Sequence, residues 1–232
     1  MPNETTPGRT VEPHVQRSGE TVPAAVRAQI LATEHWSLLG TRGTTWTEVM
    51  SRISIHLTVA SAGLVVLALV AQGVGFGMAF DVLSIGLASG VLVLGTLTGV
   101  RVHNASVDDA ALIMGMNRIR AAYVAIDPGL APYFVASWHD DRAGLMRTYT
   151  MGAARHMVSH VVGSTSMFMN VVNSIVAGVL GALIANAANA TPTLTAIIGS
   201  LSALAYFFVM LAIGRRTFAQ PPIDARFPTP SA

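Results

Sequence analysis

The stretch FDVLSIGLASGVLVLGTLTGV, residues 80–100, decides the class of fold. Asp81 is its only charged residue, and Arg101 follows its last position. A bilayer core about 30 Å thick needs about 20 mainly apolar residues in one helix. The stretch has that length and predicts a helix that spans a membrane.

Three further apolar windows of similar length lie at residues 53–76, 161–185 and 193–213. The chain is 52% hydrophobic and 11% charged, with a mean hydropathy of +0.54, and is too apolar for an ordinary soluble domain. Only short links join the first window to the second and the third to the fourth, so each pair must be antiparallel. We expect an all-α integral membrane protein with four transmembrane helices in two antiparallel pairs.

The segments outside these windows predict a further division of the chain. Residues 1–20 are rich in proline, glycine and polar residues and are expected to be disordered. Residues 21–52 suit an amphipathic, interfacial helix that Gly40 and Gly43 break. The complete expected division is 1–20, 21–52, transmembrane helices 1 and 2 in 53–100, a helical hairpin in 101–160, transmembrane helices 3 and 4 in 161–213, and a non-helical, mobile, proline-rich tail in 214–232.

The basic residues predict the orientation. All 14 are arginine, a bias that we attribute to a GC-rich bacterial genome. They lie before residue 53, between 101 and 160, or after 213, and the two short links contain none. Segments that carry the positive charge stay in the cytoplasm. We therefore expect a multi-pass protein of the bacterial inner membrane, with both termini and residues 101–160 on the cytoplasmic side.

The central segment predicts a helical hairpin that extends spans two and three. Apolar residues recur at helical spacing from Leu112 to Ile126, and Asp127-Pro128-Gly129 then ends the first arm. Ser137 and Asp140 suit the start of a second arm over 138–160. Antiparallel arms of equal length place Arg155 beside Asp109, and Arg120 near Asp141.

The foot of this hairpin holds the candidate metal site. His156 and His160 are spaced i, i+4, as in helical metal pairs, and the register brings them to the level of His103 and Asp108. Imidazole and carboxylate together suit zinc, manganese or iron. Arg155 in the same cluster disfavours a cation. Headgroup-level anchoring is the favoured interpretation and no cofactor is predicted, while a proton-linked site and a metal or haem site remain alternatives.

Three amides in the spans are pore-lining candidates. Asn170 and Asn173 share one face of the third span, and Gln72 lies near the end of the first. An unpaired amide is costly in hydrocarbon, so each must meet another helix or water. Hydrogen bonds between helices of one chain are the favoured interpretation, and an oligomeric pore lined by the third span is the alternative.

No nucleophile elbow, phosphate-binding loop, H-E-x-x-H motif or dinucleotide fingerprint occurs in the sequence. The arginines are spread along the segments that orientation already explains, which argues against nucleic-acid binding. We therefore expect a non-enzymatic protein whose partners are the lipid bilayer and further copies of itself, and which acts as a structural or signalling membrane component. A small oligomeric ion channel, and a metal- or haem-binding membrane protein, are the alternatives.

Overall fold

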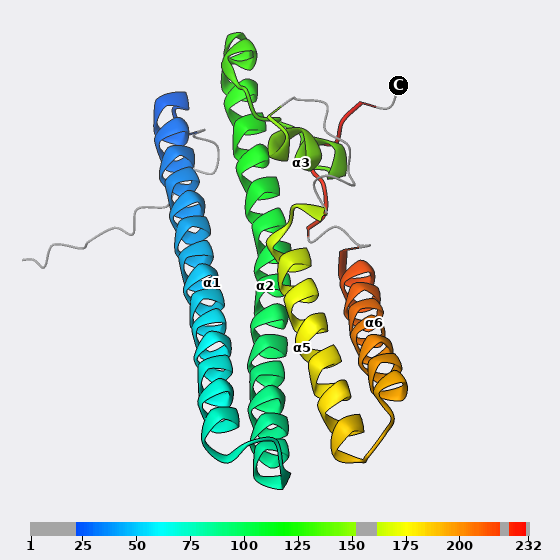
Figure 1. Ribbon diagram of the computed structural model, residues 1–232. Coiled ribbons are helices and arrows are strands. Elements are labelled where there is room, and N and C mark those ends of the chain that lie inside the picture. The colour runs from blue at the N-terminus through cyan, green and yellow to red at the C-terminus, as the bar shows by residue number, and fades with distance from the viewer. Residues whose placement is uncertain (1–21, 152–161, 219–222, 231–232) are drawn as a thin grey trace, which may run out of the picture.

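The computed structural model describes residues 22–151, 162–218 and 223–230, and every regular element within them is a helix (Figure 1). Four helices are long and apolar enough to cross a membrane. They are α1 (Ala24–Val74), α2 (Met78–Ile126), α5 (Thr165–Ala187) and α6 (Pro192–Phe218). The expected disordered segment 1–20 lies outside the described residues.

Helix α1 is one unbroken helix of 51 residues, so the expected break at Gly40 and Gly43 is wrong. A glycine inside a helix costs only about 1 kcal/mol relative to alanine, which packing along a long partner helix can offset. Two threonines also bond back to the glycine carbonyls: Thr44 Oγ1 lies 3.3 Å from the oxygen of Gly40, and Thr47 Oγ1 lies 2.9 Å from that of Gly43. The amphipathic segment and the first apolar window are therefore one rod.

A seven-residue repeat runs along α1 on the side that packs against α2. Such a repeat keeps one stripe of a helix against its neighbour over many turns. Its members are buried or half-buried, although three of them are polar or charged. They are Ala28, His35, Arg42, Val49, His56, Gly63 and Val70.

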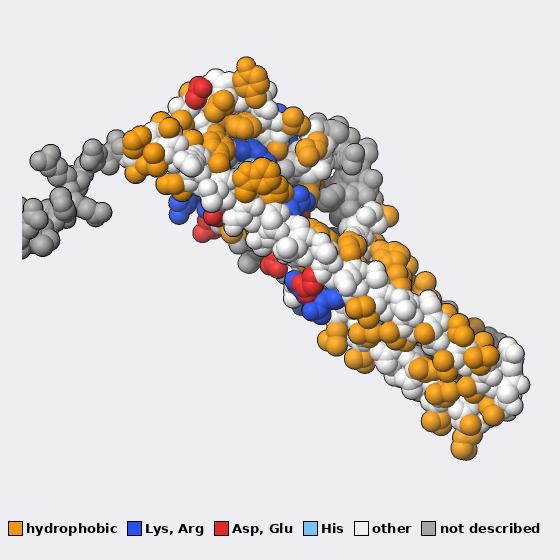
Figure 2. Space-filling view, turned by 90° about the vertical axis from the view of Figure 1, so that its left-hand side faces the viewer, with side chains coloured by type: hydrophobic (Ala, Val, Ile, Leu, Met, Phe, Trp, Pro, Cys, Tyr) orange, Lys and Arg blue, Asp and Glu red, His pale blue; other side chains and the backbone are white. Residues whose placement is uncertain are grey.

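Helix α2 turns back along α1 after Gly75 and Gly77, and it too continues without a break from its apolar half into its polar half. We call the paired segments 24–52 of α1 and 101–126 of α2 the stalk. Figure 2 shows charged side chains on the stalk, whereas the apolar half shows none on this face. Glu48 marks the boundary, because its carboxylate accepts hydrogen bonds from Arg101 Nη2 at 2.7 Å and Arg52 Nε at 2.8 Å.

Two short helices follow α2 up to residue 151. A 3-10 helix, η1 (Pro128–Tyr133), follows Asp127, and α3 spans Arg142–Tyr149, so the second arm begins at 142 and not at 138; its expected residues 152–160 lie outside the described residues. Asp141, rather than Ser137, caps α3, because its Oδ1 accepts from the N–H of Gly144 at 2.7 Å. Ser137 instead accepts from the N–H of His139, which makes a turn.

The four long helices lie in the order α1, α2, α5, α6 (Figure 1), and each packs mainly against its neighbours in this order. Helices α5 and α6 approach closely because glycines face each other. A Cβ at Gly178 would lie 3.0 Å from the carbonyl oxygen of Gly199, so neither position has room for a larger residue.

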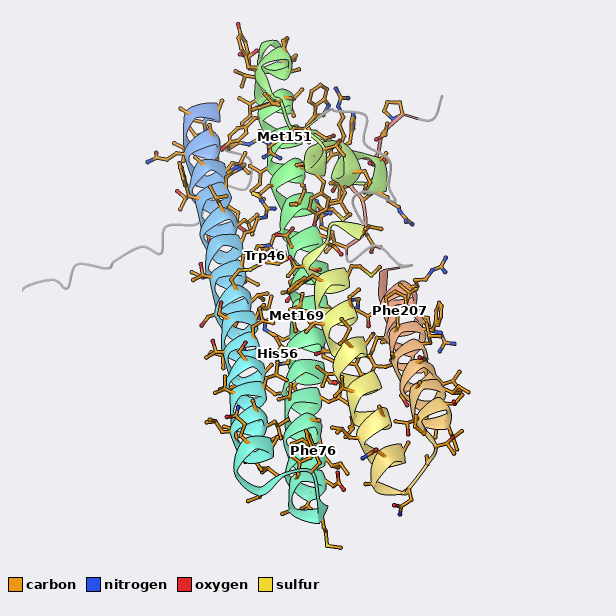
Figure 3. All side chains as sticks on the ribbon, in the orientation of Figure 1. Trp46, His56, Phe76, Met151, Met169 and Phe207 are labelled. Atoms are coloured by element: carbon orange, nitrogen blue, oxygen red, sulfur yellow. The ribbon has the colours of Figure 1, made fainter. Side chains whose placement is uncertain are left out.

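A small buried cluster joins three of the long helices where the stalk meets the apolar half. Val49 and Ile53 of α1 pack there against Val102 and Ala105 of α2 and Met169 of α5. Trp46 lies beside this cluster, and Figure 3 shows it and Met169 at neighbouring levels of the molecule. The cluster fixes the register of α1 and α5 on α2, and therefore the polar contacts above and below it.

Candidate functional site

The polar half of the molecule is built around the carboxylate of Asp109, which is 3% exposed. Arg42 donates to it through Nε at 2.6 Å and Nη2 at 3.4 Å. Trp46 Nε1 donates to Oδ1 at 2.8 Å, and the hydroxyl of Tyr149 donates to Oδ2 at 2.8 Å. One carboxylate thus ties α1, α2 and α3 together.

The surroundings of Tyr149 keep its hydroxyl protonated, so that it can donate a hydrogen bond. Burial, followed by the adjacent Asp109 carboxylate, raises the pKa of the Tyr149 hydroxyl far above its ordinary value. The proton therefore stays on the phenol at any physiological pH. With four donors on its two oxygens, Asp109 is a satisfied structural tie and not a free base or metal ligand.

Asp109 was expected to meet Arg155, which lies outside the described residues. Its observed partners Arg42, Trp46 and Tyr149 were missed by sequence reasoning. Arg42 and Trp46 are spaced i, i+4 and so share one face of α1, which is the signal that could have pointed to a common acceptor.

The candidate metal residues are only partly described. His156 and His160 lie outside the described residues, so their placement stays a prediction. Asp108 is 63% exposed and its carboxylate lies 3.8 Å from Arg101 Nη1, while His103 lies near α6, with Cε1 3.7 Å from where a Cβ of Gly214 would be. Within ranges 22–151, 162–218 and 223–230, no three His, Cys, Asp or Glu residues form a metal-binding group.

The second polar centre is Asp140, which is fully buried and binds the C-terminal tail. Its carboxylate accepts from the backbone N–H of Arg226 at 3.0 Å and from that of Phe227 at 2.6 Å. Arg118 of α2 donates to its Oδ2 at 2.8 Å. The backbone N–H of Asp140 donates in return to the carbonyl of Phe227 at 3.2 Å.

Two further contacts extend this docking site. Asp141 accepts from the backbone N–H of Thr229 at 2.7 Å and from its Oγ1 at 3.1 Å. Arg118 also donates through Nη2 to the carbonyl of Asp224 at 2.5 Å. Residues 223–230 are non-helical and make these contacts with the Asp140 region, while the expected mobility of the tail stays a prediction.

Burial alone would raise the pKa of the Asp140 carboxyl. The backbone N–H groups of Arg226 and Phe227, together with the Arg118 guanidinium, outweigh burial and leave that pKa below its ordinary value. The pKa of the Asp141 carboxyl is lowered in the same way, because the N–H groups of Gly144 and Thr229 outweigh its burial. Both groups are therefore ionised when the tail is bound.

The tail is attached almost entirely by these hydrogen bonds. Residues 224–230 are all exposed, and even Phe227 remains 40% exposed. A hydrogen bond to a charged group contributes about 1.5–3 kcal/mol, while ordering each residue costs about 1–2 kcal/mol. The summed contribution of the hydrogen bonds and the summed cost of ordering the residues are of similar size, so the bound tail is only marginally stable.

Asn117 of α2, which is fully buried, holds α3 and the turn before it. Its Nδ2 donates to the carbonyl of His139 at 2.9 Å, and its Oδ1 accepts from Thr148 Oγ1 at 3.0 Å and Arg120 Nη1 at 2.7 Å. These contacts position Asp140 without the tail. We call η1, α3, their connection and tail residues 223–230 the cap.

In the apolar half, His56 and Asn173 converge on Gly95 of α2. A Cβ at Gly95 would overlap Asn173 Oδ1 and lie 2.7 Å from His56 Cε1. His56 is 0% and Asn173 1% exposed, and Figure 3 shows His56 between α1 and α2. Neither ring nitrogen of His56, nor Oδ1 of Asn173, has a hydrogen-bond partner among the described residues.

The pore-lining candidates do not come together. Asn173 packs inside the chain against Gly95, and Asn170 Nδ2 donates to the carbonyl of Phe207 on α6 at 3.2 Å. Gln72 is exposed near the far end of α1. The two asparagines thus serve contacts between helices of one chain, which gives no support to the pore alternative.

Comparison with protein-family models, curated proteins and solved structures finds no match to this chain. Its function must therefore be inferred from the stalk, the cap and the helices themselves.

Proposed function

We propose that the chain is a non-enzymatic structural or signalling component of the bacterial inner membrane that acts as a self-associating scaffold. The observation that carries this proposal is the exposed apolar surface on the stalk. Val26, Ile30 and Trp36 of α1 are 45%, 60% and 71% exposed, respectively. They lie at least 17 residues before the first apolar window, or about 25 Å along a helix, beyond the reach of the lipid chains. Apolar surface in water favours a protein partner.

The open arrangement of the helices supports association of like chains. Helix α1 packs mainly against α2 and meets α5 at the cluster around Val49 and Met169, so among the described residues much of its surface is uncovered. Thr58, Ser61 and Ala62 on the apolar half of α1 line a shallow groove of about 450 Å³, where small residues allow another helix to approach. A second copy shares the membrane orientation, so identical stripes meet at the same height.

We further propose that the four helices cross the membrane as two antiparallel pairs with both termini in the cytoplasm. The arginines support this orientation, because all those described lie on the stalk side of the apolar half. In this proposal the stalk is the part of the scaffold that projects from the membrane. Helix α1 is about 76 Å long at 1.5 Å per residue, which is more than twice the thickness of a bilayer core. The scaffold thus presents a rigid helical pair to the cytoplasm.

Single cysteines test the association directly, because the chain contains none. Ile30→Cys and Trp36→Cys place a thiol on the exposed sides of the stalk, and Ala28→Cys places one on the seam with α2 as a matched control. We expect oxidation in native membranes to yield a covalent dimer from at least one exposed position and none from position 28. A monomer at all three positions, supported by a monomeric mass in lipid nanodiscs, would refute self-association through the stalk.

A further inference from the structure

The Asp140 region has the features of a peptide-binding site that the chain's own tail occupies. The groups it contacts are almost all backbone groups: the N–H groups of Arg226, Phe227 and Thr229 and the carbonyls of Asp224 and Phe227. The side chain of Thr229 adds the one hydroxyl contact. Such a site reads an extended main chain and not a particular set of side chains.

The prolines of the tail fit this pattern. Pro228 lies between Phe227 and Thr229, whose N–H groups donate to Asp140 and Asp141, and Pro230 follows. Proline lacks an N–H, so it is suited to the positions that face no carboxylate, and it favours the extended backbone that the site binds. The recognised element is therefore an extended segment with two adjacent N–H groups, followed by proline.

The site is built independently of the tail, whereas the tail is held only through the site. Asn117 and Arg118 of α2 fix the segment around Asp140, and Asp141 caps α3. Residues 223–230 bury no large apolar side chain, and their hydrogen bonds are nearly balanced by the cost of ordering them. An internal ligand held in this way can be displaced by a segment that makes the same bonds.

We propose that Asp140 and Asp141 form a binding site for an extended, proline-flanked segment of another protein chain, and that the tail is its exchangeable internal occupant. This proposal rests on the proposed scaffold function and identifies the site at which the scaffold binds a partner protein. A partner segment would replace the N–H groups of Arg226 and Phe227 at Asp140. Two carboxylates beside Arg118 make the site selective for N–H donors and unfavourable to an acidic segment.

The test uses the full chain in nanodiscs and a fluorescent peptide with the sequence of residues 223–230. Replacing Arg226 and Phe227 of the protein by proline removes both N–H donors to Asp140 and frees its carboxylate; we call this variant the tail-released protein. We expect the peptide to bind this tail-released protein and to bind wild-type protein more weakly, because the wild-type tail competes. Asp140→Asn in the tail-released protein should weaken binding at least about tenfold.

A control peptide that is N-methylated at the nitrogens of Arg226 and Phe227 differs only in the loss of both donors. It should bind the tail-released protein at least about tenfold more weakly than the unmodified peptide. Because this comparison needs no change at Asp140, it decides the matter even if Asp140→Asn fails to fold. Equal binding of the two peptides, or no binding of either, overturns the proposal. Cross-linking through α1 is a separate readout, so failure of self-association is distinguishable from failure of the peptide site.

Discussion

Arg42 Nε lies 2.6 Å from Asp109 Oδ1, a contact that spans 67 residues of sequence and joins α1 to α2 in the stalk. Trp46 and Tyr149 donate to the same carboxylate, so the tie between the two long helices also holds α3. A single buried group thus couples the stalk to the cap.

Replacing Asp109 should destabilise the polar half far more than replacing its neighbour. Asp109→Asn leaves Arg42 without its carboxylate and should lower the free energy of unfolding by about 2–4 kcal/mol. Tyr149→Phe removes one donor and should cost about 1 kcal/mol. Asp108→Asn is the matched control, since Asp108 is exposed, and should change stability by less than about 0.5 kcal/mol. Denaturant unfolding in detergent measures all three, and equal losses at positions 108 and 109 would contradict the tie.

The convergence of His56 and Asn173 on Gly95 predicts a glycine that cannot be replaced. The methyl group of Gly95→Ala would overlap the Asn173 amide, and overpacking should cost about 1–3 kcal/mol. Gly90→Ala on the same helix meets nothing within 4 Å and should be neutral or slightly stabilising. Unfolding of the two variants in mixed detergent provides the measurement. A neutral Gly95→Ala would show that the three helices do not meet as described.

Acid should release the tail from Asp140. The N–H groups of the docked tail, together with Arg118 at Asp140 and the Gly144 N–H at Asp141, hold the pKa of both carboxyls below the ordinary value, so their contribution to docking is complete above the pKa of the free groups, about 3.9. It is lost as the pH falls through the lowered values. A spin label at Ala225→Cys should therefore be immobile from pH 5 to 8 and mobile only below about pH 4. The same label in an Asp140→Asn background should be mobile throughout, and a release near pH 6 would assign docking to another group.

The proposed topology predicts on which side of the membrane four positions lie. Fusions of alkaline phosphatase at Gly77 and Asn189 should be active, because both short turns lie outside the cytoplasm in this arrangement. Fusions at Gly129 and at the C-terminus should be inactive, whereas fluorescent reporters there should report a cytoplasmic location. Phosphatase activity at Gly129 would reverse the orientation of the stalk and cap.

Local properties of the chain were sufficient to predict the four long apolar helices and the end of α2 at Asp127. Apolar length and turn residues act over a few positions, so a single sequence contains them. The glycines at 40 and 43 misled the prediction because their cost is small against packing along a 51-residue helix. The repeat on α1 was concealed because His35, Arg42 and His56 occupy positions where apolar residues would have revealed it.

Only the tertiary structure decided the partners of the buried polar groups. Arg42 reaches Asp109 because the cluster of Val49, Val102 and Met169 sets the register of the helices. Phe227 reaches Asp140 across 87 residues because Asn117 and Arg118 hold the segment around Asp140 against α2. From the sequence alone, the acids at the start of α3 could cap the helix or bind another segment. Asp141 does both, because it accepts from the N–H groups of Gly144 and Thr229. Apolar spans are determined by composition over about 20 residues, whereas the pairing of one carboxylate is determined by how the whole chain packs.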